Sequence, residues 1–101
     1  MDNQKPQQER LEPCPGTLYI VGTPIGNLGD LSPRAKSILK NVSLIACEDT
    51  RRSGLLLKKI DSNVNLLSYH KHNIKSRQSQ LLELLENNGS IALISDAGLP
   101  G

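Results

Sequence analysis

Four short apolar runs alternate with longer segments in which apolar residues recur at helical spacing. The runs are residues 18–21, 44–47, 64–69 and 91–94. Short runs of branched aliphatic residues are typical of strands that are covered on both faces of a parallel sheet. The run at 64–69 is less apolar than the others, which favours a place at or near a sheet edge.

The first two strands are each predicted to be followed by a helix. Ser32 can cap the first helix, and Pro33 suits the first helical position, where no amide hydrogen bond is lost. Thr50 is the predicted cap of the second helix, which is expected to extend to Ile60. Gly54 weakens this second helix, because glycine loses more conformational entropy than other residues in a helix.

A third helix is predicted after the third strand, with Asn73 as its cap and Gly89 marking its end. Its expected buried stripe consists of Ile74, Leu81, Leu82 and Leu85. Alternating strands and helices imply right-handed crossovers. The sequence therefore predicts an α/β fold with a mainly parallel sheet and helices on both faces.

Length and composition allow one domain with a modest core. The chain has 101 residues and no Trp or Phe, so Leu, Ile, Val and Ala must fill that core. Residues 1–16 are rich in Gln, Pro and charge and lack an apolar h-region, which predicts a disordered leader instead of a signal peptide. Residues 17–101 form the predicted domain. The net charge of +2 neither demands nor excludes a polyanionic partner.

Cysteine and histidine usage argues against a disulfide or a metal site. Cys14 and Cys47 form no ligand pattern, and reduced thiols in a cytoplasmic protein are the simpler interpretation. His70 and His72 have no apparent third ligand, so no metal is expected. No apolar run approaches the length that spans a bilayer, and no membrane partner is expected.

Two loops follow predicted strands and have small, turn-forming residues. Residues 22–28 follow the first strand, and residues 95–101 follow the fourth. Ligands of open α/β sheets bind beyond the carboxyl ends of the strands, so both loops could line one crevice. Asp96 suits an amine, a ribose hydroxyl or a sulfonium-bearing cofactor, although turn geometry alone is the alternative. The glycine spacing is neither a dinucleotide fingerprint nor a P-loop.

A polar segment follows each of the two middle strands. In the first, residues 48–52, helix capping alone accounts for Asp49, whereas Arg51 is electrostatically disfavoured at a helix start. An anionic ligand or a carboxylate partner would explain Arg51 better. In the second segment, residues 69–73, contact with a polar or phosphate-bearing substrate competes with a solvated rim in which Asn73 is a helix cap. Lys71, Lys75 and Arg77 give this rim a local positive charge.

These four segments, in this order, resemble the tetrapyrrole methylase superfamily, also called the class III methyltransferase fold. The matching segments are residues 18–28, 46–51, 69–73 and 95–101. They are most similar to the bacterial branch that acts on ribosomal RNA. The resemblance covers Thr17 to the end of the chain and implies an N-terminal α/β domain whose C-terminal partner domain is absent.

The resemblance implies an S-adenosylmethionine-dependent enzyme. It would methylate the ribose 2′-hydroxyl of a cytidine in 16S ribosomal RNA of the small ribosomal subunit, and it would be a homodimer when complete. The residues that match the cofactor side of the cleft are Thr23, Pro24, Ile25, Ser95, Asp96, Ala97 and Gly98. Those that match the acceptor side are Glu48, Asp49, Thr50, Arg51, His70 and Asn73.

Chemistry suggests roles for some of these residues. A ribose hydroxyl is a weak nucleophile, and a positioned base would help to remove its proton. Asp49 is the first candidate for orienting or deprotonating this hydroxyl, and His70 is the second. Arg51 suits an RNA phosphate, because its guanidinium can bind two oxygens together. One departure from the family pattern is Leu99, which stands where Thr is usual; the other is Gly22, which replaces Ala or Pro.

Three alternatives remain from the sequence. One is a methyltransferase of the same superfamily that acts on a tetrapyrrole ring. Another is a non-catalytic α/β module that binds RNA or protein. The third is a nucleotide-dependent dehydrogenase with Glu48 or Asp49 on a ribose, against which the missing glycine fingerprint counts. The chain is expected to fold alone and to lack turnover, because the cleft would have only one wall.

Overall fold

The computed structural model describes residues 12–22 and 31–95, and strands alternate with helices throughout these ranges. The elements are β1 (Leu18–Gly22), α2 (Pro33–Asn41), β2 (Leu44–Cys47), α3 (Thr50–Lys59), β3 (Leu66–Ser68), α4 (Ile74–Glu86) and β4 (Ile91–Ser95). This order confirms the predicted alternation.

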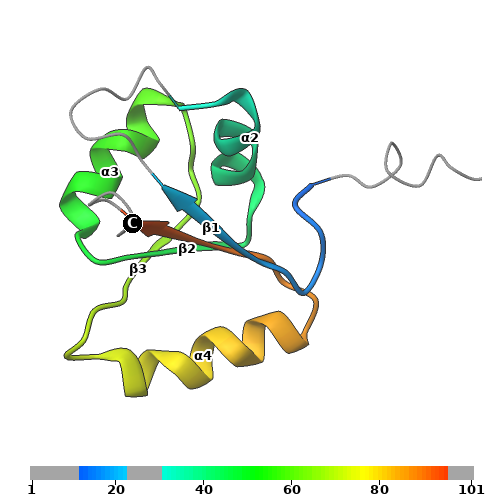
Figure 1. Cartoon of the computed structure of the whole chain (residues 1–101), viewed down its shortest axis with the longest axis vertical. Helices are drawn as coiled ribbons and strands as arrows, with labels where there is room; N and C mark the ends of the chain where they lie inside the picture. Colours follow the sequence, from blue (N-terminus) through cyan, green and yellow to red (C-terminus); the bar gives the residue numbers. More distant parts are fainter. Residues whose placement is uncertain (1–11, 23–30, 96–101) are drawn as a thin grey trace, which may run out of the picture.

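The strands form a four-stranded sheet in the order β1-β4-β2-β3, and all three pairings are parallel. Helices α2 and α3 cover one face of the sheet, and α4 covers the other (Figure 1). The chain moves from β1 to β2 to β3 in one direction and returns from β3 to β4. A right-handed crossover must change faces when its direction reverses. The predicted α/β class, with a parallel sheet and helices on both faces, is confirmed.

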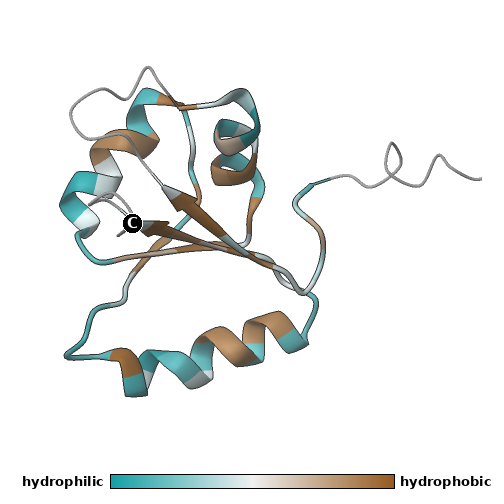
Figure 2. Ribbon diagram, in the orientation of Figure 1, coloured by the Kyte–Doolittle hydropathy of each residue, from teal (hydrophilic) through white to brown (hydrophobic). Residues whose placement is uncertain are grey.

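Aliphatic side chains fill two core clusters, one on each face of the sheet. The larger cluster lies under α2 and α3 and includes Leu39 and Ile45, both fully buried. The smaller one lies under α4 and contains Ala46, Leu81 and Ile91. Figure 2 shows the strands as largely apolar, whereas the helices alternate apolar and polar segments. Branched aliphatic residues thus supply the core, as the composition predicts.

The cap of α2 is confirmed, and the predicted cap of α3 is wrong by one residue. The Ser32 hydroxyl accepts a hydrogen bond of 3.1 Å from the backbone N–H of Ala35, and Pro33 is the first helical residue. In α3 the N-cap is Asp49, with extended backbone angles, and Thr50 is already helical. Both residues are good caps, and the carboxylate occupies the position from which it can reach the free amides of the first turn.

Strand β3 is shorter than predicted. It spans Leu66–Ser68 instead of residues 64–69, and it lies at the edge of the sheet as expected. Among the described residues it pairs with β2, which has four residues and ends at Cys47. The last ladder bond is the one that the N–H of Tyr69 donates to the carbonyl of Cys47, at 2.8 Å. The end of β2 therefore limits β3 at its carboxyl end.

Helix α4 differs from the prediction at its start and along its stripe. Asn73 occupies the N-cap position but makes no side-chain cap hydrogen bond. Leu81 is buried, as predicted, and Leu85 packs against the smaller core cluster. Ile74 and Leu82 are 38% and 51% exposed. Adjacent helical residues are about 100° apart, so Leu82 cannot share the inward direction of Leu81.

Gly89 follows α4 and is required there by close packing. Its N–H donates to the carbonyl of Leu84 at 2.9 Å. A Cβ at this position would lie 2.9 Å from the same carbonyl oxygen and closer still to the Leu84 side chain. Asn88, with φ of 70°, supplies the left-handed residue that turns the chain out of the helix. Gly89 thus marks the end of α4, as predicted, through its lack of a side chain.

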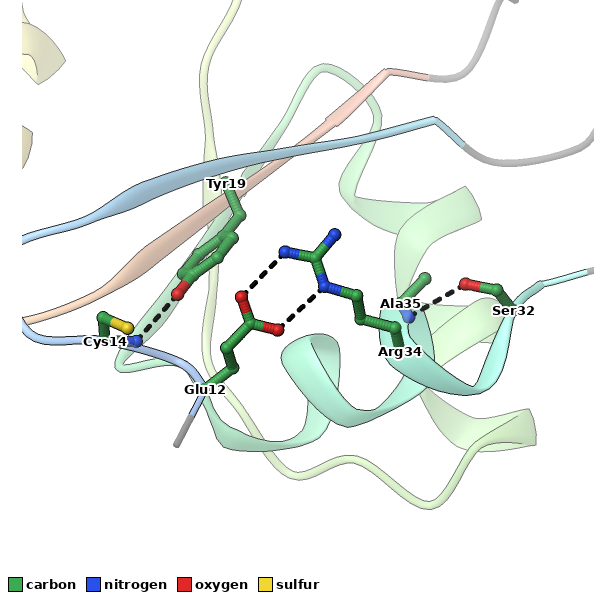
Figure 3. A network of polar contacts seen from close by, with 6 residues as sticks. All are labelled: Glu12, Cys14, Tyr19, Ser32, Arg34 and Ala35. Carbon is green, nitrogen blue, oxygen red and sulfur yellow. Dashed lines mark hydrogen bonds and ion pairs between the residues drawn. The ribbon is translucent and has the colours of Figure 1, made fainter. Parts of the chain in front are cut away.

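The predicted leader is only partly within the described residues. Residues 1–11 lie outside them, whereas 12–16 lie against the domain. The Glu12 carboxylate accepts two hydrogen bonds from the Arg34 guanidinium, at 2.7 and 2.8 Å, and Cys14 N–H donates to the Tyr19 hydroxyl at 2.7 Å (Figure 3). Burial raises the pKa of Tyr19, and the hydrogen bonds that the Arg34 guanidinium donates to the Glu12 carboxylate raise the pKa of Arg34. These contacts tie residues 12–14 to β1 and α2.

Two further expectations concern the thiols and the membrane. Within the described ranges, Cys14 is partly buried, Cys47 is buried in the core, and the two are not joined by a disulfide. None of the helices in residues 12–22 and 31–95 is long and apolar enough to cross a bilayer.

Replacing Gly54 by Ala is expected to stabilise the domain by about 0.5–1 kcal/mol, because alanine loses less backbone entropy in a helix interior. The new Cβ would lie 3.8 Å from the nearest atom, Cδ1 of Leu66, so it fits without displacement. Urea unfolding measures the change. Gly89→Ala is the matched control, and it should destabilise because its Cβ meets a backbone oxygen. A Gly54→Ala variant less stable than the parent chain would contradict this packing of α3 on β3.

Candidate active site

The parallel sheet brings all four strand ends to one edge. Gly22 is the register partner of Ser95, Ile94 is the partner of Cys47, and Cys47 is the partner of Ser68. The order along this carboxyl edge is therefore Gly22, Ser95, Cys47 and Ser68. Open α/β sheets bind their ligands beyond this edge. Every segment that the sequence singles out for chemistry begins here.

Two loops predicted to bind the cofactor leave the sheet side by side. Their residues Thr23, Pro24, Ile25, Asp96, Ala97 and Gly98 lie outside the described residues, as does the departure at Leu99. The last described residues before the loops are Gly22 and Ser95, which are partners in adjacent strands. Among the described residues, no atom lies within 4 Å of a Cβ added to Gly22. No described side chain therefore covers the end of β1.

Asp49 is fixed at the start of α3 by its own capping bonds. Its Oδ1 accepts hydrogen bonds from the backbone N–H groups of Arg51 and Arg52, at 3.0 and 3.2 Å. No residue of the described ranges donates to Oδ2, and the side chain is exposed. The neighbouring Glu48 and Thr50 are exposed as well. One oxygen of Asp49 thus positions the carboxylate, and the other accepts no hydrogen bond from a described residue.

Arg51 lies in the first turn of α3, where a cation is disfavoured by the helix dipole. The sequence predicts an anionic ligand or a carboxylate partner for Arg51. Its guanidinium is exposed and makes no hydrogen bond or ion pair to any residue within 12–22 and 31–95. A carboxylate partner is therefore not found among these residues, and an accessible guanidinium remains beside Asp49.

The turn between β3 and α4 brings His70 and Asn73 together. The Asn73 Oδ1 accepts from the backbone N–H of His70 at 2.8 Å, and its Nδ2 donates to the carbonyl and hydroxyl of Ser68 at 3.2 and 3.1 Å. The ring Nδ1 of His70 accepts from the backbone N–H of His72 at 3.2 Å. Asn73 therefore ties the turn to the strand end instead of capping the helix.

Arg77 is part of the same network; the sequence predicts its positive charge at this rim but not its contact with Ser68. Its Nε donates to the carbonyl of Ser68 at 3.2 Å, and its Nη2 lies 3.5 Å from the Ser68 hydroxyl. The signal in the sequence is its spacing of four residues from Asn73, which places both on one side of a helix. Ser68, Asn73 and Arg77 together fix the turn that carries His70.

No group of three metal-ligating side chains occurs within the described ranges. The rings of His70 and His72 lie edge to face, with centroids 5.7 Å apart.

Comparison with curated proteins gives several similar sequences with one shared name. Proteins named ribosomal RNA small subunit methyltransferase I match at 54% identity in Mycoplasmopsis pulmonis, 52% in Synechocystis and 47% in Escherichia coli O157:H7. The matches cover 82%, 85% and 93% of this chain, and 37%, 31% and 33% of those proteins, respectively. The chain thus spans about a third of the length of the relatives it matches.

A family model gives an independent match. The model described as tetrapyrrole (corrin/porphyrin) methylases matches residues 17–101. This range begins immediately before β1 and includes all four strand ends and the loops that follow them. The chain therefore belongs to the tetrapyrrole (corrin/porphyrin) methylase family.

Proposed function

We propose that this chain is the N-terminal α/β domain of an S-adenosylmethionine-dependent enzyme that methylates the 2′-hydroxyl of a cytidine ribose in 16S ribosomal RNA. The observation that carries this proposal is the strand order at the carboxyl edge. The ends of β1 and β4 are neighbours, and so are the ends of β2 and β3. This order supports a cofactor half beside an acceptor half, as a two-substrate transfer requires. The shared name of the relatives supports ribosomal RNA as the acceptor.

The cofactor half has features that fit a methyl donor. Among the described residues, no atom lies within 4 Å of a Cβ built on Gly22, and Ser95 ends the adjacent strand beside it. The residues proposed to hold the donor are Thr23, Pro24, Ile25, Ser95, Asp96, Ala97 and Gly98. The Asp96 carboxylate would bind its amine or ribose hydroxyls. When bound, S-adenosylmethionine supplies an electrophilic methyl group on a sulfonium.

In the acceptor half, Asp49 is proposed to orient the ribose hydroxyl and to remove its proton. The capping bonds hold one carboxylate oxygen and so fix the side-chain rotamer of Asp49. The other oxygen would therefore be in place to accept a hydrogen bond from the ribose hydroxyl. Alignment of donor and acceptor supplies much of the rate in such a transfer. The accessible Arg51 guanidinium would bind a phosphate of the RNA. Glu48, Thr50 and Asn73 would contact the acceptor from the ends of β2 and β3.

The complete protein tests this function. We expect it to bind S-adenosylmethionine in calorimetric titration, to be a cytoplasmic homodimer, and to methylate small ribosomal subunits from a strain that lacks the enzyme. Mapping should locate the methyl group on one cytidine ribose. The 101-residue chain is the control, and it should show no turnover.

Two results would contradict the proposal. Methylation of a tetrapyrrole without methylation of ribosomal RNA would assign the other branch of the family. Binding of RNA by the complete protein without any methyl transfer would indicate a non-catalytic module.

A further inference from the structure

The hydrogen bonds around His70 determine which ring nitrogen carries the proton. Nδ1 accepts from the backbone N–H of His72, so it cannot carry a proton itself. A neutral imidazole has one N–H, and the remaining position is Nε2. This gives the Nε2–H form of the His70 ring.

The neighbouring amide agrees with this assignment. The nitrogen of Asn73 has two protons, and these are directed to the carbonyl and the hydroxyl of Ser68. The Asn73 Nδ2 lies 3.4 Å from Nε2 of His70, farther than from either Ser68 oxygen. The roles of the two groups in this contact depend on which ring nitrogen carries the proton, and Nδ1 is already an acceptor. The Nε2 nitrogen is therefore assigned as a donor, on a side chain of intermediate exposure.

Arg77 stabilises the arrangement from the helix. Its guanidinium donates to the same carbonyl of Ser68 that Asn73 contacts, so both acceptor positions of that oxygen are used. The charged donor also fixes the first turn of α4 relative to the end of β3. Arg77 thus shares the Ser68 carbonyl with Asn73, and Asn73 in turn accepts from the backbone N–H of His70, so we expect the direction of the His70 ring to depend on Arg77.

We propose that His70 donates a hydrogen bond from Nε2–H to an oxygen of the RNA backbone and does not act as the base, and that Asn73 and Arg77 are positioning residues for it. This inference rests on the proposed function for the identity of the acceptor. It leaves Asp49 as the base of the acceptor half and makes His70, the second candidate for that role, a group that binds the RNA.

The ring form is tested first, by nitrogen-15 NMR of the histidines in the unaltered 101-residue chain. We expect His70 to show a protonated Nε2 and an unprotonated Nδ1. A protonated Nδ1 would overturn the proposal, whether or not the complete protein methylates RNA. Arg77→Ala should give a mixture of ring forms, whereas Gln80→Ala, an exposed change on the same helix, should not. If Arg77→Ala fails to fold, Asn73→Asp removes the two donors to Ser68 and keeps the acceptor for His70.

The role of His70 is tested by the kinetics of the complete protein on small ribosomal subunits. His70→Ala should lower kcat/KM about tenfold, mainly through a higher KM, as expected for one lost hydrogen bond to a charged oxygen. His70→Gln should recover most of that loss, because its amide nitrogen can donate from a similar position but cannot take up a proton. A loss of 100-fold or more in kcat for both variants would instead identify a base. Absence of methylation by the unaltered protein would count against the proposed function and not against the ring form.

Discussion

Changing Asp49 to Asn in the complete enzyme is expected to lower kcat for methyl transfer by about 10²–10⁴-fold, the range typical of a lost general base. The change removes the charge and the proton affinity of the carboxylate. It keeps an oxygen that can cap α3, and Asn and Asp are about equally good caps. Stability and binding of S-adenosylmethionine should therefore stay near those of the parent enzyme. Single-turnover methylation of small ribosomal subunits measures the chemical step directly.

A matched control is Asp61→Asn. Asp61 follows α3 and has φ of 59°, a conformation that Asn also tolerates. It is at the opposite end of α3 from Asp49, so it tests the loss of one carboxylate away from the carboxyl edge. Asp49→Ala separates capping from catalysis, because it should lose about 1 kcal/mol of stability in addition to activity. An Asp49→Asn enzyme with kcat within threefold of the parent would eliminate Asp49 as the base.

The sequence predicted the elements well because their signals are local. Ser32 followed by Pro33 specifies a helix start through one side chain and one ring, and the structure has both in the expected roles. The error at α3 is of a different kind. Asp49 and Thr50 are adjacent and both can cap, so only the backbone angles distinguish them. The carboxyl end of β3 depends on where β2 ends, and β2 ends at Cys47, 19 positions before β3 begins at Leu66.

The arrangement of the candidate site depends on strand order, which no local pattern contains. The sequence alone shows four candidate segments at strand ends. Their pairing into a cofactor half and an acceptor half follows from the insertion of β4 between β1 and β2. Asn73 was expected to cap α4 because Asn before a helix usually does so. The carbonyl and hydroxyl of Ser68 instead bind its amide group. The positive charge of Arg77 at this rim was evident from the sequence. Its partner was not, because that partner is a backbone carbonyl at the end of another element.

Changing Ile45 to Ala is expected to destabilise the domain by about 2–5 kcal/mol, the usual cost of the lost burial and the cavity that remains. Ile45 is 0% exposed and lies in β2, between β4 and β3, where neither neighbour can move without breaking its ladder. A domain of this size is commonly stable by only about 5–15 kcal/mol, so the loss is a large part of the total. Urea unfolding should show a lower midpoint with an unchanged slope.

Ile20→Ala is the matched control, because it deletes the same atoms from a side chain that is 62% exposed in strand β1. It should cost less than about 1 kcal/mol, since little apolar area returns to water. Ile45→Val, which removes one methylene, should fall between the two at about 0.5–1.5 kcal/mol. This order of effects tests the sheet order as well as burial. Equal losses for Ile45→Ala and Ile20→Ala would mean that β2 is not an interior strand, and the division of the carboxyl edge into two halves would fail with it.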